Sequence, residues 1–249
     1  MRLGVFSDTH ANYEALSAVL ESYRRERIDI YYCLGDTVGY GGSPNECADL
    51  VRKISRATIL GNHDAAVSGR MDYSYYYEAA RHALDVHAAM ISEENMEWLK
   101  SLPYQHLLEA YNVLLCHGSP VRLEEFDYIF APEQARECLS IYDKLGHITL
   151  IGHSHVALSF HREDGESATG EARRPEDAVA ELGGRRWLLN PGSVGQPRDG
   201  DPRAAWLLLD LDEGSAQWRR TAYDVDGAAA AIRAARLPDS LAERLEYGQ

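Results

Sequence analysis

The stretch LGVFSDTH, residues 3–10, is the starting point for the fold, because a short apolar run ends abruptly in Asp8 and His10. A run of this length and composition is typical of a buried strand. In an extended segment, residues i and i+2 face the same side, so one carboxylate and one imidazole could bind one metal ion there. A single triplet of this kind is a weak signal, since most such triplets arise by chance or for structural reasons.

The same arrangement recurs four more times along the chain. The runs and the residues that follow them are Ile30–Gly35 with Asp36, Thr58–Gly61 with Asn62, His63 and Asp64, Val113–Cys116 with His117, and Ile148–Gly152 with His153 and His155. In layered α/β proteins, the loops at the carboxyl ends of strands converge on one crevice, where ligands bind. We therefore expect five strands to deliver these side chains to one rim.

The candidate metal ligands form a mixed set of oxygen and nitrogen donors. They are Asp8, His10, Asp36, Asn62, His117, His153 and His155. This set exceeds what one tetrahedral zinc ion needs, and it suffices for two ions if one carboxylate bridges them. It requires no thiolate, which argues against an iron–sulfur cluster or a purely structural zinc site. Two ions ~3.5–4 Å apart suit hydrolysis at phosphorus, with a bridging hydroxide as the nucleophile.

The segments between the runs predict the architecture. Helical spacing of apolar residues over Ala11–Arg27, and a Ser43-Pro44 start that predicts a helix to about Ser55, give strand–helix–strand units with parallel strands. After Asp64 this alternation stops. Residues 65–102, called the insertion below, predict helices over Tyr75–Met90 and Glu93–Lys100 and contain a cluster of tyrosines. We interpret the insertion as a helical cap beside the rim.

The second half of the chain predicts further elements around the same core. They are a helix over Ala131–Lys144, a strand over Val156–His161, a polar loop over Arg162–Asp177, a hairpin of Val179–Leu182 and Arg185–Leu189 joined by Gly183-Gly184, strands over Ala205–Asp210 and Gln217–Tyr223, and helices over Gly227–Arg236 and Asp239–Tyr247. No interdomain linker is visible, so we expect one domain over residues 1–249.

Composition restricts the partners. The 249 residues carry a net charge of −14 and no long basic stripe, which argues against an extended nucleic-acid surface. No apolar run approaches the ~20 residues of a membrane span. Four cysteines without a C-x-x-C pair, and a start that passes directly into a strand, favour a cytoplasmic protein with no membrane partner. The sequence makes no prediction about oligomeric state.

The five motifs together resemble those of the calcineurin-like metallophosphoesterase superfamily. Their order is D-x-H, G-D-x-V, G-N-H-D, H-G and G-H-x-H, and they span Asp8 to His155. The Asn190–Ser193 segment is similar to that of the small bacterial and archaeal phosphodiesterase branch. The resemblance implies an α/β fold, a four-layer α/β/β/α sandwich of two mixed sheets flanked by helices.

The resemblance also implies roles for the site residues. It assigns Asp8, His10, Asp36 and His155 to one metal ion, and Asp36, Asn62, His117 and His153 to the other. Manganese is the expected metal, and iron, zinc, cobalt or nickel would also suit these ligands. His63 would contact the phosphate and protonate the leaving oxygen, oriented by Asp64. Imidazole is the usual general acid near neutral pH, and a neighbouring carboxylate favours its charged form.

The chain departs from the family pattern at Tyr40. The stretch Gly35–Gly41 places Tyr40 where the Ser/Thr protein phosphatases and the dinucleoside polyphosphate hydrolases carry an arginine, and Leu60 replaces a second arginine. A bidentate arginine suits a dianionic phosphomonoester, so its absence favours a singly charged phosphodiester. Arg198 could partly replace the missing arginine, or it could be a solvated loop residue.

Further candidates for substrate contact have structural alternatives. Tyr75 and Tyr76 could stack on a nucleobase or pack the insertion onto the core. Ser193 belongs to a predicted tight turn near the rim, where it could contact substrate. The leading prediction is therefore a phosphodiesterase for a small or nucleotide-like substrate. A phosphomonoesterase, a pyrophosphohydrolase, or a non-catalytic metal-binding scaffold for a protein partner are the alternatives. A scaffold could lose His63 without penalty, yet every expected position is filled.

Overall fold

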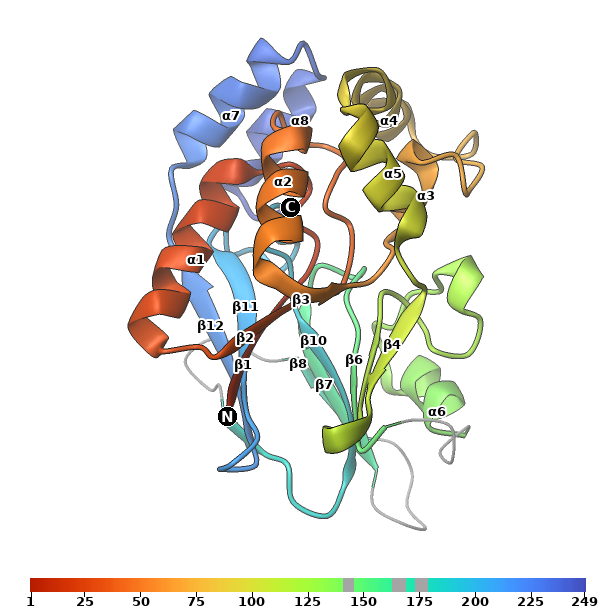
Figure 1. Ribbon diagram of the computed structural model, residues 1–249, viewed down its shortest axis with the longest axis vertical. Helices are drawn as coiled ribbons and strands as arrows, with labels where there is room; N and C mark the ends of the chain where they lie inside the picture. Colours follow the sequence, from red (N-terminus) through yellow and green to blue (C-terminus); the bar gives the residue numbers. More distant parts are fainter. Residues whose placement is uncertain (141–145, 163–168, 173–178) are drawn as a thin grey trace.

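Two mixed six-stranded sheets form the centre of the computed structural model, which describes residues 1–140, 146–162, 169–172 and 179–249 (Figure 1). The first sheet has the order β3-β2-β1-β11-β12-β9, and its strands are β1 (Arg2–Phe6), β2 (Ile30–Cys33), β3 (Ser55–Thr58), β9 (Val179–Glu181), β11 (Ala204–Asp210) and β12 (Ser215–Thr221). The second has the order β4-β5-β6-β10-β7-β8, and its strands are β4 (Gln105–Leu108), β5 (Val113–Cys116), β6 (Ile148–Leu150), β7 (Ala157–Arg162), β8 (Thr169–Ala172) and β10 (Arg186–Pro191).

The amino-terminal part of the first sheet follows the predicted strand–helix alternation. β1, β2 and β3 are parallel, and α1 (Tyr13–Glu26) and α2 (Pro44–Ile54) connect them. Asn12 caps α1 by accepting a hydrogen bond from the Ala15 amide. The apolar stripe of α1, including Leu16 and Val19, packs on the outer face of this sheet beside Trp206 of β11. Burial of this stripe holds the helix against the sheet.

The main core lies between the two sheets. Leu3 and Val5 of β1 pack in one buried cluster with Leu115 of β5 and Leu150 of β6. The helices α1 and α2 lie outside the first sheet, and α6 (Pro132–Ser140) packs outside the second (Figure 1). The expected four-layer sandwich of two mixed sheets flanked by helices is confirmed.

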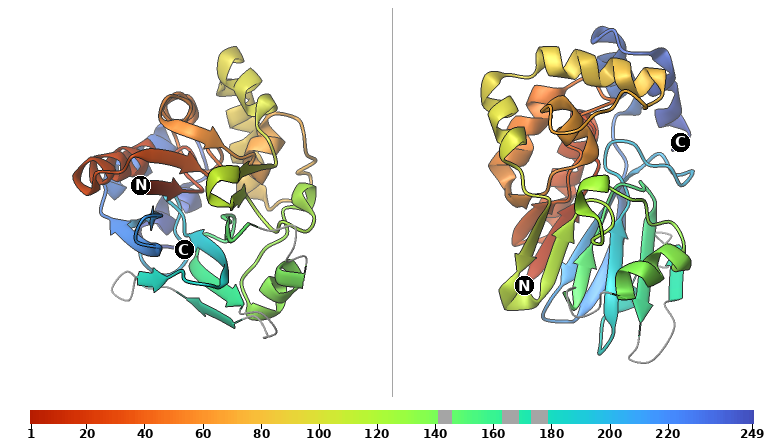
Figure 2. Two further views of the ribbon diagram at one scale, coloured as in Figure 1. Left: turned by 60° about the horizontal axis from the view of Figure 1, so that its bottom comes forward. Right: turned by 90° about the vertical axis from the view of Figure 1, so that its right-hand side faces the viewer.

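The remaining helices gather at the end of the sandwich where the parallel strands end (Figure 2). They are α3 (Asn62–Val67), α4 (Glu78–Met90) and α5 (Glu93–Ser101), which run between β3 and β4, and α7 (Val225–Ala234) and α8 (Asp239–Glu243) near the carboxyl end of the chain. Short 3-10 turns cover Glu109–Tyr111, Leu123–Glu125 and Arg244–Glu246. α4 begins at Glu78 rather than Tyr75, so Tyr75, Tyr76 and Tyr77 precede the helix.

The predicted hairpin of residues 179–189 is wrong. β9 pairs with β12 in the first sheet, whereas β10 lies between β6 and β7 in the second. The Gly183-Gly184 segment therefore carries the chain from one sheet to the other. Two short alternating strands with a glycine pair look the same in sequence whether they pair with each other or with distant strands.

Smaller differences concern element ends. The third strand ends at Thr58, three residues before Gly61. β4 was not predicted, because three of its four residues are exposed on a sheet edge. Most of the predicted loop over Arg162–Asp177 lies outside the described residues, but β8 falls within it and pairs with β7. The predicted helix over Ala131–Lys144 is observed to Ser140, and residues 141–145 lie outside the described residues.

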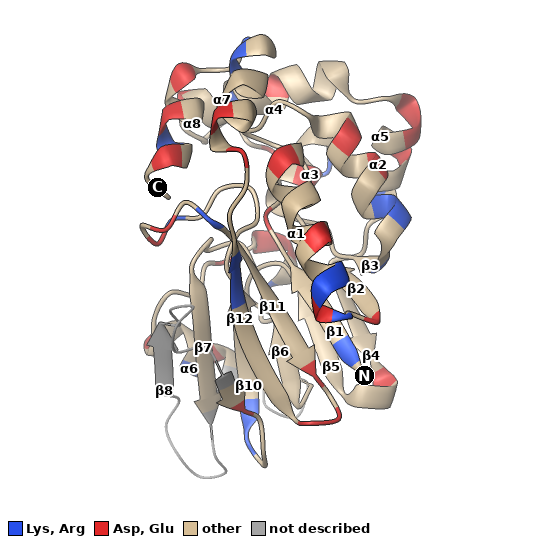
Figure 3. Ribbon diagram, turned by 90° about the vertical axis from the view of Figure 1, so that its left-hand side faces the viewer, with Lys and Arg blue, Asp and Glu red and all other residues tan. Residues whose placement is uncertain are grey.

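The surface agrees with the acidic composition. On the face drawn in Figure 3, Lys and Arg residues are scattered among Asp and Glu residues. Among the described residues, no helix combines the length and apolarity needed to cross a membrane.

Candidate metal centre

The predicted ligands converge from both sheets. Asp8 follows β1, Asp36 follows β2, His117 follows β5, and His153 and His155 follow β6, while Asn62 opens α3, which three residues separate from the end of β3. All seven predicted ligands are buried. Asp8, His10, Asp36, His153 and His155 have positive φ angles, between 48° and 67°. Such backbone conformations are costly for residues other than glycine and concentrate at functional sites.

The first group of ligand atoms surrounds Asp8. The Nε2 atoms of His10 and His155 lie 3.0 Å apart, and His155 Nε2 lies 3.3 Å from Asp8 Oδ1. His10 Nε2 also lies 3.6 Å from Asp36 Oδ2. These atoms are close enough to share one ion.

The second group lies on the other side of Asp36. His117 Nε2 is 3.4 Å from Asp36 Oδ2 and 3.1 Å from Asn62 Oδ1. One nitrogen of His153 completes a set with Asp36 and His117 in which the ligand atoms are all within 4.8 Å of one another. Asp36 therefore faces both groups, at the position that the resemblance assigns to a bridging carboxylate.

The donor atoms suit a cation. In His10, His117 and His155, Nδ1 lies 3.0, 2.7 and 2.6 Å from the backbone carbonyls of Val38, Leu34 and Gln196. Each Nδ1 therefore carries a proton, which leaves Nε2 as the nitrogen that can bind a metal ion, an arrangement common for metal-binding histidines. Asp8 Oδ1 and Asp36 Oδ2 are buried without a hydrogen-bond partner among the described residues. Because unpaired buried carboxylates are costly, the residues present fit bound metal ions.

The pKa values of the buried carboxylates and of His117 indicate that positive charge stabilises the site. Burial raises the pKa of Asp8 to about 6. Burial also opposes ionisation of Asp36, but the imidazoles of His117, His63 and His10 hold the pKa of its carboxyl well below its usual range. Burial lowers the pKa of His117, yet Asp36 and Asp8 outweigh this effect and raise the pKa to about 9. A proton on His117 thus supplies charge that a metal ion would supply in its place.

His63 sits at the edge of this centre. Its amide donates to Asp36 Oδ1 at 2.8 Å, and its ring centroid lies 4.4 Å from that of Tyr40 and 4.8 Å from that of His10. Its Nδ1 has no hydrogen-bond partner among the described residues. Burial lowers the pKa of His63 to about 4, opposite to the direction expected from the sequence.

Asp64 does not orient the His63 ring as expected. Its carboxylate accepts hydrogen bonds from the amides of Thr37, Val38 and Gly61 at 2.9 to 3.2 Å. The physical reason is helical geometry, because adjacent residues at the start of α3 point in different directions. Burial, together with nearby Asp36, raises the pKa of Asp64 to about 7. Asp64 instead joins the start of α3 to the loop after β2.

A pocket of ≈ 370 Å³ opens beside the metal centre. Tyr40, Asn62, His63, Met71, Tyr75, Tyr76, Tyr77, Glu125, Phe126, Asp127, Tyr128, His153 and Arg198 line it. The predicted substrate contacts Tyr40, Tyr75, Tyr76 and Arg198 therefore share one pocket with metal ligands and His63. Tyr75 is 72% exposed, so it contributes little to packing the insertion on the core.

Arg198 is the single Lys or Arg residue among the described residues that line this pocket. Its Nη2 donates to Gln196 Oε1 at 2.9 Å, and its guanidinium lies 5.7 Å from the Tyr40 ring centroid. Nη2 also donates to the Tyr40 hydroxyl at 3.4 Å, whereas among the described residues Nε has no hydrogen-bond partner and no carboxylate pairs with the guanidinium. The side chain is thus held in place with its charge uncompensated, as expected for a residue that binds an anion.

Ser193 does not line the pocket, contrary to the prediction from the sequence. Its hydroxyl donates to the Asp8 carbonyl at 2.9 Å and accepts from the Gln196 amide at 2.8 Å, and the residue is fully buried. Asn190 acts similarly, since its amide group donates to the Gly152 carbonyl and to Ser154 Oγ. The Asn190–Ser193 turn therefore supports the loops that carry Asp8, His153 and His155.

Tyr128 is a pocket residue that the sequence analysis missed. Its ring stacks on His153 with a centroid separation of 3.8 Å and an interplanar angle of 13°, and it is 43% exposed. The ring of Phe130 stacks on the ring of Tyr128, with a centroid separation of 5.1 Å. The alternation of Phe126, Tyr128 and Phe130 after the His117-Gly118 motif is the signal that could have indicated an aromatic wall.

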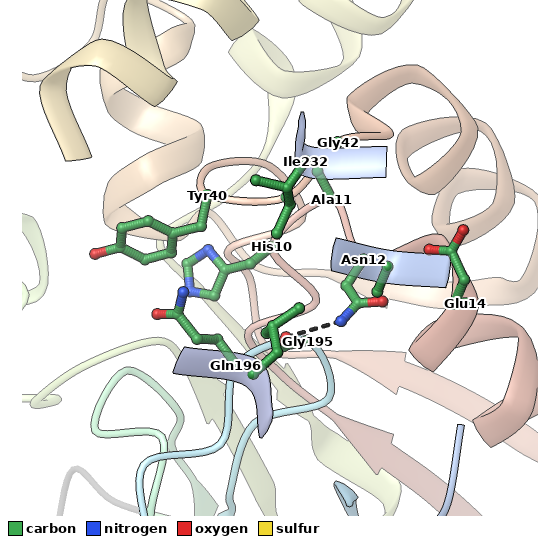
Figure 4. Close-up of a pocket in the computed structure, with 12 residues that line it drawn as sticks. His10, Ala11, Asn12, Glu14, Tyr40, Gly42, Gly195, Gln196 and Ile232 are labelled. Atoms are coloured by element: carbon green, nitrogen blue, oxygen red, sulfur yellow. Dashed lines mark hydrogen bonds between the residues drawn. The ribbon is translucent and has the colours of Figure 1, made fainter. Parts of the chain in front are cut away.

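A second cavity lies beside His10 and is also lined by Tyr40, Asn12 and Gln196 (Figure 4). Its volume is ≈ 10 Å³, and its walls include Asn12, whose side chain donates to the Gly195 carbonyl at 2.9 Å. A cavity of this size holds at most about one water molecule. The candidate metal centre is therefore closely packed on the side of this small cavity, and the larger pocket lies open beside it.

Comparison with known proteins agrees with this geometry. Residues 1–214 match the model of the calcineurin-like phosphoesterase superfamily domain. The crystal structure of a metallophosphoesterase from Sphaerobacter thermophilus superposes with a TM-score of 0.86 at 33% identity, over 100% of this chain and 99% of that one. An uncharacterized protein of Methanocaldococcus jannaschii is 34% identical over 99% of this chain and 98% of its own length.

A more distant relative has a named activity. The symmetrical bis(5'-nucleosyl)-tetraphosphatase of Actinobacillus succinogenes is 28% identical over 135 residues, which cover 52% of this chain and 48% of that protein. The family match extends over most of the chain and includes all five motifs, so the resemblance seen in the sequence is confirmed. The prediction that the protein is a metal-dependent phosphoesterase is confirmed with it. The chain belongs to the calcineurin-like phosphoesterase superfamily.

Proposed function

We propose that this protein is a two-metal phosphodiesterase that hydrolyses a small, nucleotide-like substrate. The observation that carries the proposal is the charge of the pocket, where Arg198 is the single Lys or Arg residue among the described lining residues. Tyr40 stands beside it at the place where related phosphatases carry an arginine. One cation suits a phosphodiester, which has one negative charge.

Two half-sites would hold the metal ions. Asp8, His10 and His155 would bind one ion, Asn62, His117 and His153 the other, and Asp36 would bridge them. When bound, the ions would activate a water molecule as the nucleophile and neutralise charge on the phosphoryl oxygens. We expect manganese, and the donor set would also accept iron, zinc, cobalt or nickel.

The protein's side chains bind and orient the substrate. Arg198 would pair with a non-bridging phosphoryl oxygen, and the ring of Tyr40 limits how far its guanidinium can move. In hydrolysis, the water oxygen forms a bond to phosphorus and the bond to the leaving oxygen breaks. His63, which lines the pocket next to Asn62, would donate the proton that the leaving oxygen takes up, once the negative charge of a bound phosphate raises its pKa from about 4.

The pocket rim disfavours a polyphosphate chain. Glu125 and Asp127 line the pocket along with Arg198, and because Asp127 is paired with Arg122 at 2.6 Å, Glu125 supplies most of the negative charge at the rim. A dinucleoside tetraphosphate, the kind of substrate named for the relative from Actinobacillus succinogenes, would place about four negative charges near these carboxylates. We therefore rank a diester above a pyrophosphate link for this chain.

The aromatic walls favour a substrate with a planar ring. Tyr75, Tyr77 and Tyr128 all line the pocket, and their rings are exposed. Exposed aromatic faces stack on any nucleobase, because every base has a π-face. A diester that carries a nucleoside would thus place its phosphate at Arg198 and its base against one of these rings.

A matrix of metals and substrates tests the proposal. Metal-stripped protein is reloaded with each divalent ion in turn and assayed with a bis-aryl phosphodiester, the matched aryl monoester, a cyclic or linear nucleotide diester, and a dinucleoside polyphosphate. We expect the highest kcat/KM for the nucleotide diester, with manganese among the activating metals. A tenfold preference for the monoester or the polyphosphate would contradict the proposal.

A further inference from the structure

The buried histidine His87 lies in the insertion, on α4, outside the metal centre. It is fully buried, and both of its ring nitrogens contact the backbone of the loop after β2. The Gly39 amide donates to His87 Nδ1 at 2.9 Å, and His87 Nε2 lies 2.9 Å from the Gly41 carbonyl oxygen. A neutral ring with its proton on Nε2 satisfies both bonds.

These two bonds flank Tyr40. Gly39 has a φ of 93° and Tyr40 a φ of 61°, so the loop has backbone conformations that residues other than glycine rarely adopt. The Tyr40 ring packs against the rings of His63 and His10. His87 therefore fixes, from a different element, a strained turn that touches both the proposed proton donor and a metal ligand.

The loop also sets the space that His63 occupies. A Cβ atom on Gly39 would lie 2.2 Å from His63 Nδ1, so the backbone at Gly39 is in direct contact with the ring. Since Nδ1 has no hydrogen-bond partner among the described residues and Asp64 bonds elsewhere, packing alone orients this imidazole. The Gly39 backbone and the Tyr40 ring supply much of that packing.

We propose that His87 is a positioning residue for catalysis, which holds the Gly39–Gly41 loop so that His63 faces the pocket in one orientation. The insertion then has a role besides forming the substrate wall, because one of its helices determines the geometry of the site. This inference rests on the proposed function insofar as it assigns proton donation to His63. A small displacement of a catalytic group can reduce a rate by as much as ~10²-fold.

The test compares three variants of the metal-loaded protein. His87→Ala removes both bonds, and His87→Gln keeps a donor that can reach the Gly41 carbonyl. Leu99→Ala is the control for packing, because Leu99 on α5, the next helix of the insertion, is equally buried and shares a core cluster with Val38 but makes no hydrogen bond to the loop. We expect both alanine variants to melt at a lower temperature.

Two readouts separate positioning from stability. Hydrogen exchange of a peptide covering residues 37–42 should accelerate in His87→Ala and not in Leu99→Ala. With an alkyl leaving group, kcat should fall ~10- to 100-fold in His87→Ala with KM changed less than about threefold, and it should partly recover in His87→Gln. With a nitrophenolate leaving group, the fall should be smaller.

Specific results would overturn the inference. Unchanged exchange at residues 37–42 in His87→Ala would show that His87 does not hold the loop. An equal loss of kcat in Leu99→Ala at the same melting temperature would show a general effect of destabilisation. Failure of the proposed function would appear differently, as a wild-type preference for another class of phosphoester, and the same comparison would then use that substrate.

Discussion

The side-chain amide of Asn62 donates a hydrogen bond of 2.7 Å to the hydroxyl oxygen of Tyr76. Asn62 is a proposed metal ligand, and Tyr76 belongs to the insertion. Because the amide nitrogen is bonded to Tyr76, the other end of the group, Oδ1, points toward His117 and the metal centre. Tyr76 therefore does more than line the pocket, since its hydroxyl determines which atom of Asn62 faces a cation.

Tyr76→Phe should weaken binding of the second metal ion. The phenyl ring keeps the aromatic wall, but the Asn62 amide loses its acceptor and can rotate. Loss of a residue that orients a metal ligand typically lowers metal affinity ~10- to 100-fold. Metal titration by calorimetry, followed by elemental analysis after dialysis, measures the effect. Unaltered affinity for both ions would show that Asn62 is held by other contacts.

Tyr75→Ala should raise KM for a nucleotide diester ~10-fold or more and leave a small alkyl diester nearly unaffected. Tyr75 is mostly exposed in the pocket, so its ring is available to a substrate. A lost base stack costs ~1–3 kcal/mol. Tyr111→Ala, which removes an exposed ring at the distant Glu109–Tyr111 turn, is the control. Equal effects on both substrates would contradict stacking by Tyr75.

The side chains proposed to bind metal could be brought together from the sequence because each lies just after a short apolar run. Sheet geometry then brings strand ends together, whichever sheet a strand belongs to. Asp8 and His117 come from different sheets, yet His117 Nε2 lies 3.9 Å from Asp8 Oδ1. The assignment of each strand to one of the two sheets was harder to predict from the sequence. β9 and β10 could not be separated because their partners, β12 and β6, lie far away along the chain.

The direction of individual side chains was the second feature that the sequence predicted poorly. Asp64 follows His63 directly, which suggested contact, but a helix begins there and turns the two side chains apart. Ser193 was expected in the pocket because its turn lies near the rim, yet its hydroxyl serves the backbone of the Asp8 loop. Tyr128 enters the site through an irregular loop, where the alternation of Phe126, Tyr128 and Phe130 is the one sequence signal and does not show which way the rings point. Sequence patterns specify strand ends well, and they specify loop side chains poorly.

Asp36→Asn should reduce bound metal below two ions per chain and abolish turnover. Asp36 Oδ2 lies within 3.6 Å of imidazole nitrogens from both groups, so this carboxylate supplies negative charge to both half-sites. A neutral amide offers one weaker donor oxygen. Elemental analysis of the purified variant, with circular dichroism as the check on folding, measures the outcome. Fully active enzyme with one ion per chain would refute a bridging role.

His63→Gln should keep the fold and both metal ions but lower kcat by roughly 10²–10⁴, the usual range for a general acid. The loss should shrink for leaving groups of low pKa, which need little protonation. A series of aryl diesters with leaving groups of increasing pKa provides the measurement. A loss that is constant across the series would exclude proton donation and leave His63 a role in binding the phosphate.

Arg198→Met should raise KM for phosphodiesters ~10-fold or more while metal content stays at the wild-type level. The methionine side chain can still lie against Tyr40, but the pocket loses the single Lys or Arg residue among its described lining residues. Hydrogen bonds to charged groups contribute about 1.5–3 kcal/mol, which corresponds to that change in affinity. Arg203→Met, just before β11 and paired with Asp201 at 2.6 Å, removes the same charge outside the residues that line the pocket and should leave KM unchanged. Steady-state kinetics at two salt concentrations separates the two variants, because a long-range charge effect would weaken with salt and appear in both. Similar KM values for wild type and Arg198→Met would remove the main support for a singly charged diester as the substrate.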